Sequence, residues 1–270
     1  MKYILMILMS ALLSCGVETN VYSTESFMEE NNLWMEDGIT SSYMTETEFN
    51  NIVKEFENIY KPIFGQLGRT LSFELKWSDS TVNAYNSTQG NRTVITLMGG
   101  LPRRSEVTYD GFRMVICHEI GHTLAGYPYY SGTSASNEGQ SDYFSSNACG
   151  KVFFGKMKEY KQMLNNAWAK KYCDQVETTV AKQAMCYRVM MAGKSLGNLL
   201  GVLNGSKPNF STPDTTQVTK MSDSHPKAQC RLDTYMVGTT CTKVWPTYRI
   251  PANRTEEQNT QCAKPKCWYK

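Results

Sequence analysis

The first strong hydrophobic pattern in the chain is that of an amphipathic helix. Thr45 and Glu48 have the spacing of a capping box, in which the two side chains bind backbone amides at a helix start. Apolar residues recur behind them at helical spacing: Phe49, Ile52, Val53, Phe56, Ile59 and Tyr60. Pro62 is expected to end this helix, because proline has no amide hydrogen to donate.

Three shorter patterns indicate strands. Residues 71–77 alternate strictly between apolar and polar side chains, as a half-buried strand does, and further short strands are expected at 82–86 and 92–98. From residue 142 to residue 203 the pattern is mostly helical, and 204–224 is polar with two prolines. We therefore expect an α+β fold with a small mixed sheet, an active-site helix and a mostly helical C-terminal half.

The candidate chemistry lies on a helical pattern at 112–124. Four apolar residues would bury one face of this helix: Phe112, Ile116, Ile120 and Leu124. His118 and His122 are one turn apart, so both imidazoles can reach a single ion. Glu119 is placed to take a proton from water at that ion, as in the H-E-x-x-H motif of metallopeptidases. The alternative is a core helix whose two histidines are four residues apart by chance.

A second helix is predicted shortly after the first, with Ser136 as its N-cap. Glu138 and Asp142 are then i and i+4 on one face. A catalytic zinc takes three protein ligands, and two histidines with one glutamate are a standard set. Metal-bound histidines also need a hydrogen-bond partner for the other ring nitrogen. We expect Glu138 to be the third ligand and Asp142 to orient a histidine.

Together these two helices resemble those of the gluzincin zinc peptidases. The order of motifs is most similar to that of the CAAX prenyl endopeptidase family and its bacterial periplasmic and heat-shock relatives. There, H-E-x-x-H and E-x-x-x-D precede a His-Pro followed by an arginine, here His225-Pro226 and Arg231. Upstream, that family has an Asn-Ala-aromatic strand, matched here by Asn83-Ala84-Tyr85. The resemblance covers roughly residues 45 to 235 and does not include the C-terminal tail.

The resemblance implies a zincin-like metallopeptidase domain over residues 45–236 that binds Zn²⁺. It also implies that His225 and Arg231 lie near the metal, where they assist the oxyanion or fix Glu138. The alternative for this pair is a helix start and a surface cation. The strand around Asn83-Ala84-Tyr85 would accept an extended protein or peptide substrate as an added strand.

The N-terminus has the pattern of an export signal. Residues 1–15 comprise a short basic start and an apolar run, and they end in a sequence that resembles a bacterial lipobox with Cys15 as the lipidated residue. The alternative is a plain signal peptide cut near Ser14. Residues 16–44 are polar with scattered apolar residues and are interpreted as a tether that can partly dock on the domain. We expect an exported lipoprotein of the periplasm or cell envelope, attached to a membrane through its lipid. Unlike the prenyl endopeptidases proper, the chain has no later apolar segment long enough to span a bilayer.

The cysteines support an oxidising compartment. There are nine, and nine minus Cys15 leaves eight, an even number, although 105 pairings are then possible. Four of them are expected to staple a C-terminal extension at 237–270: Cys230, Cys241, Cys262 and Cys267. Cys117 should point away from the histidine face of its helix. It is therefore interpreted as a buried thiol or disulfide partner and not as a metal ligand.

The net charge of +3 comes from interspersed acids and bases, so no nucleic-acid partner is expected. All three histidines of the chain fall in the motifs described above. The function expected from the sequence is that of a zinc-dependent endopeptidase acting on periplasmic or envelope proteins. The alternative is a zinc-stabilised lipoprotein that acts as a binding or envelope-assembly factor without proteolysis.

Overall fold

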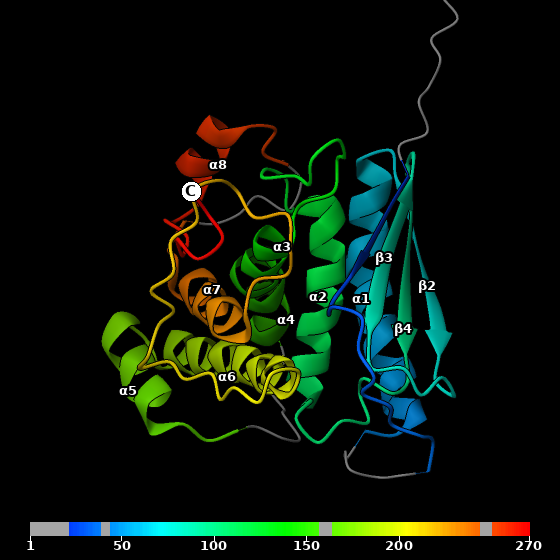
Figure 1. Cartoon of the computed structure of the whole chain (residues 1–270), viewed down its shortest axis with the longest axis horizontal. Helices are drawn as coiled ribbons and strands as arrows, with labels where there is room; N and C mark the ends of the chain where they lie inside the picture. Colours follow the sequence, from blue (N-terminus) through cyan, green and yellow to red (C-terminus); the bar gives the residue numbers. More distant parts are fainter. Residues whose placement is uncertain (1–21, 39–43, 157–163, 244–249) are drawn as a thin grey trace, which may run out of the picture.

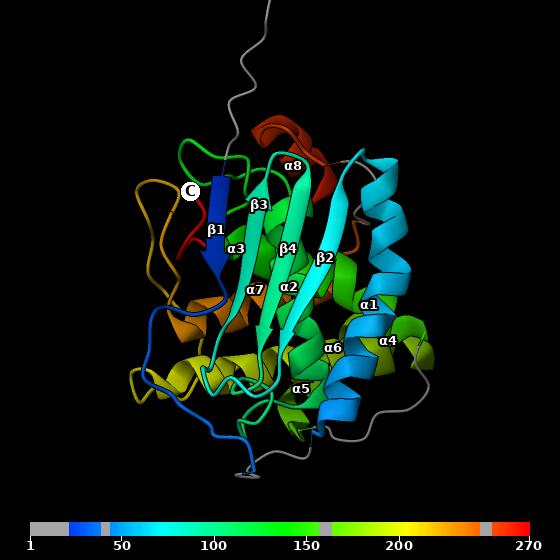
Figure 2. The same cartoon turned by 90° about the vertical axis from the view of Figure 1, so that its right-hand side faces the viewer.

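A computed structural model describes residues 22–38, 44–156, 164–243 and 250–270. The fold is α+β, as expected, with one sheet and a layered set of helices on one side of it (Figure 1). Turning the molecule by 90° shows the opposite face of the sheet, which no helix of the described residues covers (Figure 2). The predicted signal at residues 1–15 and Cys15 lie outside the described residues.

The sheet is small and mixed, with strand order β1-β3-β4-β2. Three strands lie where the sequence predicts them, within two or three residues: β2 (Thr70–Lys76), β3 (Ala84–Gln89) and β4 (Arg92–Met98). β4 pairs in parallel with β2 and antiparallel with β3. The fourth strand, β1 (Tyr22–Ser26), pairs antiparallel with β3 and forms one edge of the sheet.

β1 shows how the predicted tether at residues 16–44 docks on the domain. In addition to the strand pairing, Phe27 and Met28 directly after it are completely buried. The alternation of apolar residues is too weak in this segment to predict a strand. Its stability comes instead from backbone hydrogen bonds to the free edge of β3, which any sequence can make.

Helix α1 (Glu46–Gln66) begins with the predicted capping box of Thr45 and Glu48. It does not end at Pro62, as the sequence suggests, but continues for a further turn. Proline removes only its own amide from the helical hydrogen bonds. The side chain of Phe64 in the following turn is completely buried, and this burial, worth about 1.5–3 kcal/mol, favours continuing the helix.

Helix α2 (Tyr109–Leu124) is the centre of the molecule. All of its residues are buried, and not only the predicted apolar stripe, because the sheet covers one side and other helices cover the rest. The elements that follow are helical, as predicted. They are α3 (Glu138–Phe144), a π-helical turn (Ser145–Cys149), α4 (Gly150–Lys156), α5 (Ala167–Val176), α6 (Val180–Val202), α7 (Ala228–Thr240) and α8 (Arg254–Thr260). None of the described helices is long and apolar enough to cross a membrane.

Eight cysteines form four disulfides, which confirms the expectation of paired cysteines: Cys117–Cys149, Cys173–Cys186, Cys230–Cys267 and Cys241–Cys262. The last two attach the C-terminal extension to α7 and its end. This extension also contributes to the core, because Trp268 is completely buried and donates its indole N–H to Thr234 Oγ1 at 2.9 Å. Its ring packs against Gly139 of α3, where a Cβ atom would meet the ring at 2.1 Å.

Candidate metal centre

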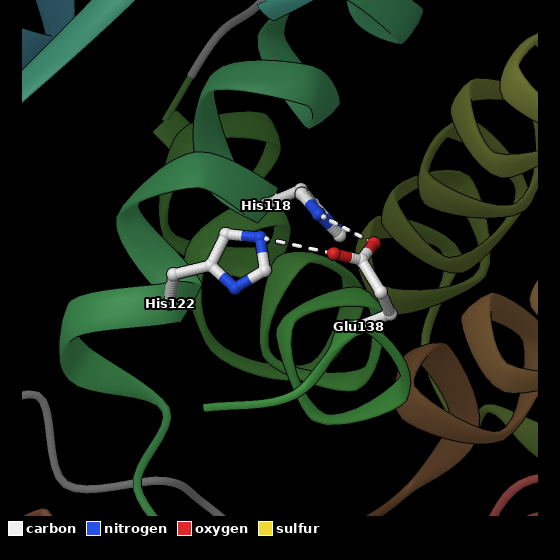
Figure 3. A group of neighbouring side chains, drawn as sticks. All are labelled: His118, His122 and Glu138. Atoms are coloured by element: carbon white, nitrogen blue, oxygen red, sulfur yellow. Dashed lines mark ion pairs between the residues drawn. The ribbon is translucent and has the colours of Figure 1, made fainter. Parts of the chain in front are cut away.

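Helices α2 and α3 bring three predicted ligands together (Figure 3). His118 and His122 project from α2 toward the carboxylate of Glu138 at the start of α3. His118 Nε2 lies 3.3 Å from Glu138 Oε2, and His122 Nε2 lies 3.5 Å from Glu138 Oε1. The two helices approach closely because residue 121 is glycine, where a Cβ atom would meet Ser141 Cα at 2.9 Å.

These three side chains fit a metal ion. One ligand atom from each lies within 4.8 Å of the others, and all three residues are buried. His118 Nε2, His122 Nε2 and Glu138 Oε2 have no hydrogen-bond partner among the described residues. A buried polar atom without a partner is costly in free energy. A cation bound between the three atoms would remove that cost, and the cluster can therefore hold a metal ion.

The second ring nitrogen of His118 and of His122, Nδ1, makes a hydrogen bond within the protein. His118 Nδ1 donates to Asp142 Oδ1 at 2.8 Å, and His122 Nδ1 donates to the backbone carbonyl of Ser136, also at 2.8 Å. A proton fixed on Nδ1 leaves Nε2 as the nitrogen that faces the cluster. Ser136 thus supports a ligand and is not the helix N-cap predicted from the sequence. Asn137 takes that position, since its side chain accepts from the Gln140 amide.

Asp142 is the hub of the polar network behind His118. Its carboxylate accepts from Arg231 Nε at 2.7 Å, from Arg231 Nη2 at 2.8 Å and from the Tyr235 hydroxyl at 2.8 Å. Burial alone would raise the pKa of Asp142, but Arg231 and His118 outweigh it and lower the pKa below its usual value. Asp142 is therefore an ionised acceptor, in the orienting position that the sequence predicts. Tyr235 was not predicted, although its i+4 spacing from Arg231 on α7 was a usable signal.

Glu138 has three further neighbours. The Tyr130 hydroxyl donates to Glu138 Oε1 at 2.7 Å, His225 Nε2 lies 3.5 Å from the same oxygen, and Arg231 Nη2 lies 3.7 Å from Oε2. Burial acts to raise the pKa of Glu138, but the histidines outweigh it and hold the pKa far below its usual value. Nothing in the sequence singled out Tyr130, which reaches Glu138 from the loop between α2 and α3.

Glu119 is completely buried, and neither of its carboxylate oxygens has a hydrogen-bond partner among the described residues. Burial raises the pKa of Glu119 to about 8. Its backbone carbonyl is fixed by Asn86 Nδ2 of β3 at 2.6 Å, which attaches the helix to the sheet at this residue. A carboxyl group without a structural partner beside a three-ligand cluster is available to exchange protons.

The predicted substrate edge is not free. Ala84 O accepts from the Phe27 amide at 3.0 Å, Asn83 Oδ1 accepts from the Met28 amide at 3.1 Å, and Tyr85 pairs in register with Ser26. The structure thus places the chain's own N-terminal segment along Asn83, Ala84 and Tyr85.

This segment also contacts the predicted His-Pro element and its arginine. His225 Nε2 donates to Ser26 O at 2.8 Å, and Arg231 Nη1 donates to Phe27 O at 2.6 Å. His225 and Arg231 therefore lie at the cluster, as expected. Burial, followed by repulsion from Glu138, raises the pKa of Glu25 in β1 to about 7.

Comparison of the chain with models of protein families, with curated proteins and with solved structures gives no match. The class of the protein is therefore defined by the structure alone. It is an α+β protein with a mixed four-stranded sheet and a buried cluster of two histidines and one glutamate that can hold a metal ion.

Proposed function

We propose that this protein is a zinc-dependent endopeptidase of the gluzincin type, with a zincin-like domain similar to that of the CAAX prenyl endopeptidase family. His118, His122 and Glu138 would hold the ion. Two histidines and one glutamate are a standard ligand set for catalytic zinc, whereas structural zinc sites are closed by four protein ligands. When bound, zinc would activate a water molecule and polarise the scissile carbonyl group.

The observation that carries the proposal is the state of Glu119. Its carboxylate is buried beside the cluster and makes no hydrogen bond within the described part of the chain. A protein that used the cluster only to tie two helices together would have no need of an unpaired buried carboxyl group, which is costly in free energy. In a peptidase, Glu119 takes a proton from the attacking water and passes it to the leaving amine.

Other residues orient the reacting groups. Asp142 and Arg231 fix the ring of His118, and the hydroxyl of Tyr130 fixes Glu138. His225 presents an N–H group 3.5 Å from Glu138, where it can donate to the carbonyl oxygen of the substrate as negative charge develops on it. The cluster is shielded from bulk water, which strengthens these electrostatic interactions.

The test is hydrolysis of a denatured protein substrate by the purified zinc-loaded protein, with and without a chelator. We expect Glu119→Gln to keep the metal and the fold and to lose activity by about 10²–10⁴-fold, the size of a lost general base. Glu106→Gln is a matched control, because this glutamate pairs with Arg104 away from the cluster. Wild-type activity in Glu119→Gln would contradict the proposal and favour a binding or envelope-assembly factor.

We also infer that the protein is exported and anchored to a membrane through Cys15. The four disulfides support this inference, because disulfides persist in oxidising compartments such as the periplasm. Its substrates would accordingly be proteins of the periplasm or cell envelope.

A further inference from the structure

The N-terminal segment at residues 22–28 lies between strand β3 and the cluster of His118, His122 and Glu138. β1 runs antiparallel to β3, and the residues that follow it continue along Ala84 and Asn83. With this segment in place, His118, Glu119 and His122 are completely buried. A protein substrate cannot reach a cluster that is closed in this way.

The contacts of this segment with Asn83, His225 and Arg231 include its backbone groups. Ser26 O accepts from His225 Nε2 at 2.8 Å, and Phe27 O accepts from Arg231 Nη1 at 2.6 Å. The Met28 amide and carbonyl both bind the side-chain amide of Asn83, each at 3.1 Å. Backbone contacts of this kind hold an extended peptide of any sequence, as in recognition by strand addition.

One side chain of the segment contacts a metal ligand directly. The Phe27 ring is completely buried. It makes an edge-to-face contact with the ring of His118, and the two ring centroids are 5.3 Å apart. The Arg231 guanidinium lies over the Phe27 ring, with its central carbon 4.7 Å from the ring centroid. The carbonyl group that precedes Phe27 is the one held by His225, which itself lies 3.5 Å from Glu138. The Ser26–Phe27 peptide bond is therefore held between the cluster and the edge of the sheet.

We propose that residues 22–28 are a pseudosubstrate strand. This inference rests on the proposed peptidase function. The Ser26–Phe27 bond marks the position of the scissile bond, and Phe27 marks the site for the side chain that follows it. Substrates are then extended peptides with a large aromatic or apolar residue after the scissile bond, running antiparallel to β3. They bind only when the segment is displaced, so the protein inhibits itself until then.

A substrate can replace the contacts that hold the segment in place. Among the described strands only β3 pairs with β1, and the burial of Phe27 and Met28 stabilises the segment further. A substrate that forms the same backbone hydrogen bonds and fills the Phe27 position regains this stabilisation.

The first experiment locks the segment in place. Thr24 and Ser87 are paired residues of β1 and β3, with side-chain oxygens 3.3 Å apart, so the double variant Thr24→Cys/Ser87→Cys can form a disulfide across the strands. We expect the locked full-length protein to hold zinc and to lose at least about tenfold in hydrolysis of an added peptide, because the segment can no longer leave. The two single cysteine variants are the controls and should retain activity.

The second experiment weakens the segment. Phe27→Ala should raise kcat/KM for an added peptide, whereas Trp34→Ala should not, although it also removes an aromatic side chain from the N-terminal region. Trp34 is 64% exposed and lies outside the segment. A fluorescein-labelled peptide with the sequence of residues 22–28 should bind the Phe27→Ala protein and not the locked protein. Its own Phe27→Ala version should bind at least about tenfold more weakly, because it lacks the aromatic ring.

The peptide-binding measurement separates this inference from the proposed function, because it does not depend on hydrolysis. Equal binding of the peptide to locked and unlocked protein would overturn the pseudosubstrate. So would equal hydrolysis by the locked protein and the single cysteine variants. Binding in the expected pattern without hydrolysis in any variant would support the strand-binding site and contradict the peptidase.

Discussion

His118 Nδ1 and Asp142 Oδ1 are 2.8 Å apart, and both residues are completely buried. The same carboxylate accepts two hydrogen bonds from Arg231 and one from Tyr235, so that α2, α3 and α7 meet at Asp142. Asp142 thus determines both the orientation of a candidate metal ligand and the packing of the helices around it.

Asp142→Asn should weaken zinc binding by about 10–100-fold, the usual effect of losing a hydrogen-bond partner behind a ligand histidine. The amide keeps the shape but cannot accept from Arg231, Tyr235 and His118 together. The measurement is a competition titration with a chromophoric chelator. Asp174→Asn is the control, because this exposed aspartate pairs with Lys170 on α5. Equal affinity in the two variants would mean that Asp142 does not orient the ligand.

His122→Ala should abolish stoichiometric zinc binding, whereas the wild-type protein should hold one ion per chain. His122 supplies one of the three ligand atoms that lie within 4.8 Å of one another. Two remaining ligands do not hold zinc against a chelator. Metal analysis by mass spectrometry after dialysis is the measurement, and circular dichroism checks the fold. Full zinc occupancy in this variant would contradict the ligand assignment.

Zinc binding should weaken as the pH falls. Burial alone would lower the pKa of His118, but Glu138 and Asp142 outweigh it and raise the pKa to about 9 in the metal-free protein. Burial lowers the pKa of His122 to about 4, so His122 is already neutral at neutral pH. Since a metal-bound histidine is neutral, zinc displaces one proton from His118, and its affinity falls about tenfold for each pH unit below the pKa of that residue.

The pH dependence is measured by chelator competition between about pH 6 and pH 8, and circular dichroism checks the fold at each pH. Calorimetry in buffers with different ionisation enthalpies should report the release of about one proton per zinc ion. A zinc affinity that is constant across this range would show that His118 is already neutral before binding.

His225→Ala should lower kcat by about 10²-fold while zinc remains bound, as expected for the loss of a donor to the oxyanion. The structure places His225 Nε2 on the Ser26 carbonyl, 3.5 Å from Glu138, without making it a member of the three-residue cluster. If His225 instead occupies the fourth position at the ion, the variant should show higher activity and weaker zinc binding. Unchanged kinetics would mean that His225 has no role in catalysis and is only a residue near the start of a helix.

Cys15→Ser should abolish lipid attachment and release the protein into the soluble fraction. The prediction rests on the lipobox-like sequence at residues 12–16. This sequence lies outside the described residues. Membrane fractionation and the mass of the mature protein are the measurements. Membrane association and mass that do not change would indicate a different anchor or a plain signal peptide.

The sequence alone was sufficient for the local geometry of the metal cluster. On a helix, residues four apart face the same side, so the spacings of His118 and His122, and of Glu138 and Asp142, place each pair correctly once both segments are helical. The capping box at Thr45 and the strands β2, β3 and β4 follow from equally local signals, and the pairing of the cysteines follows from their even number.

Only the tertiary structure decides the rest. β1 pairs with residues about 60 positions away in the sequence. The pairing is made by backbone groups, which every residue has, so no pattern of side chains predicts it. Tyr130 and Tyr235 reach the cluster because α2, α3 and α7 pack together, and Trp268 enters the core because two disulfides bring the C-terminal extension back to α7. Periodicity along a chain determines which face of an element is buried. What that face meets depends on contacts between segments far apart in sequence, and here those contacts place the N-terminal strand between β3 and the cluster that can hold a metal ion.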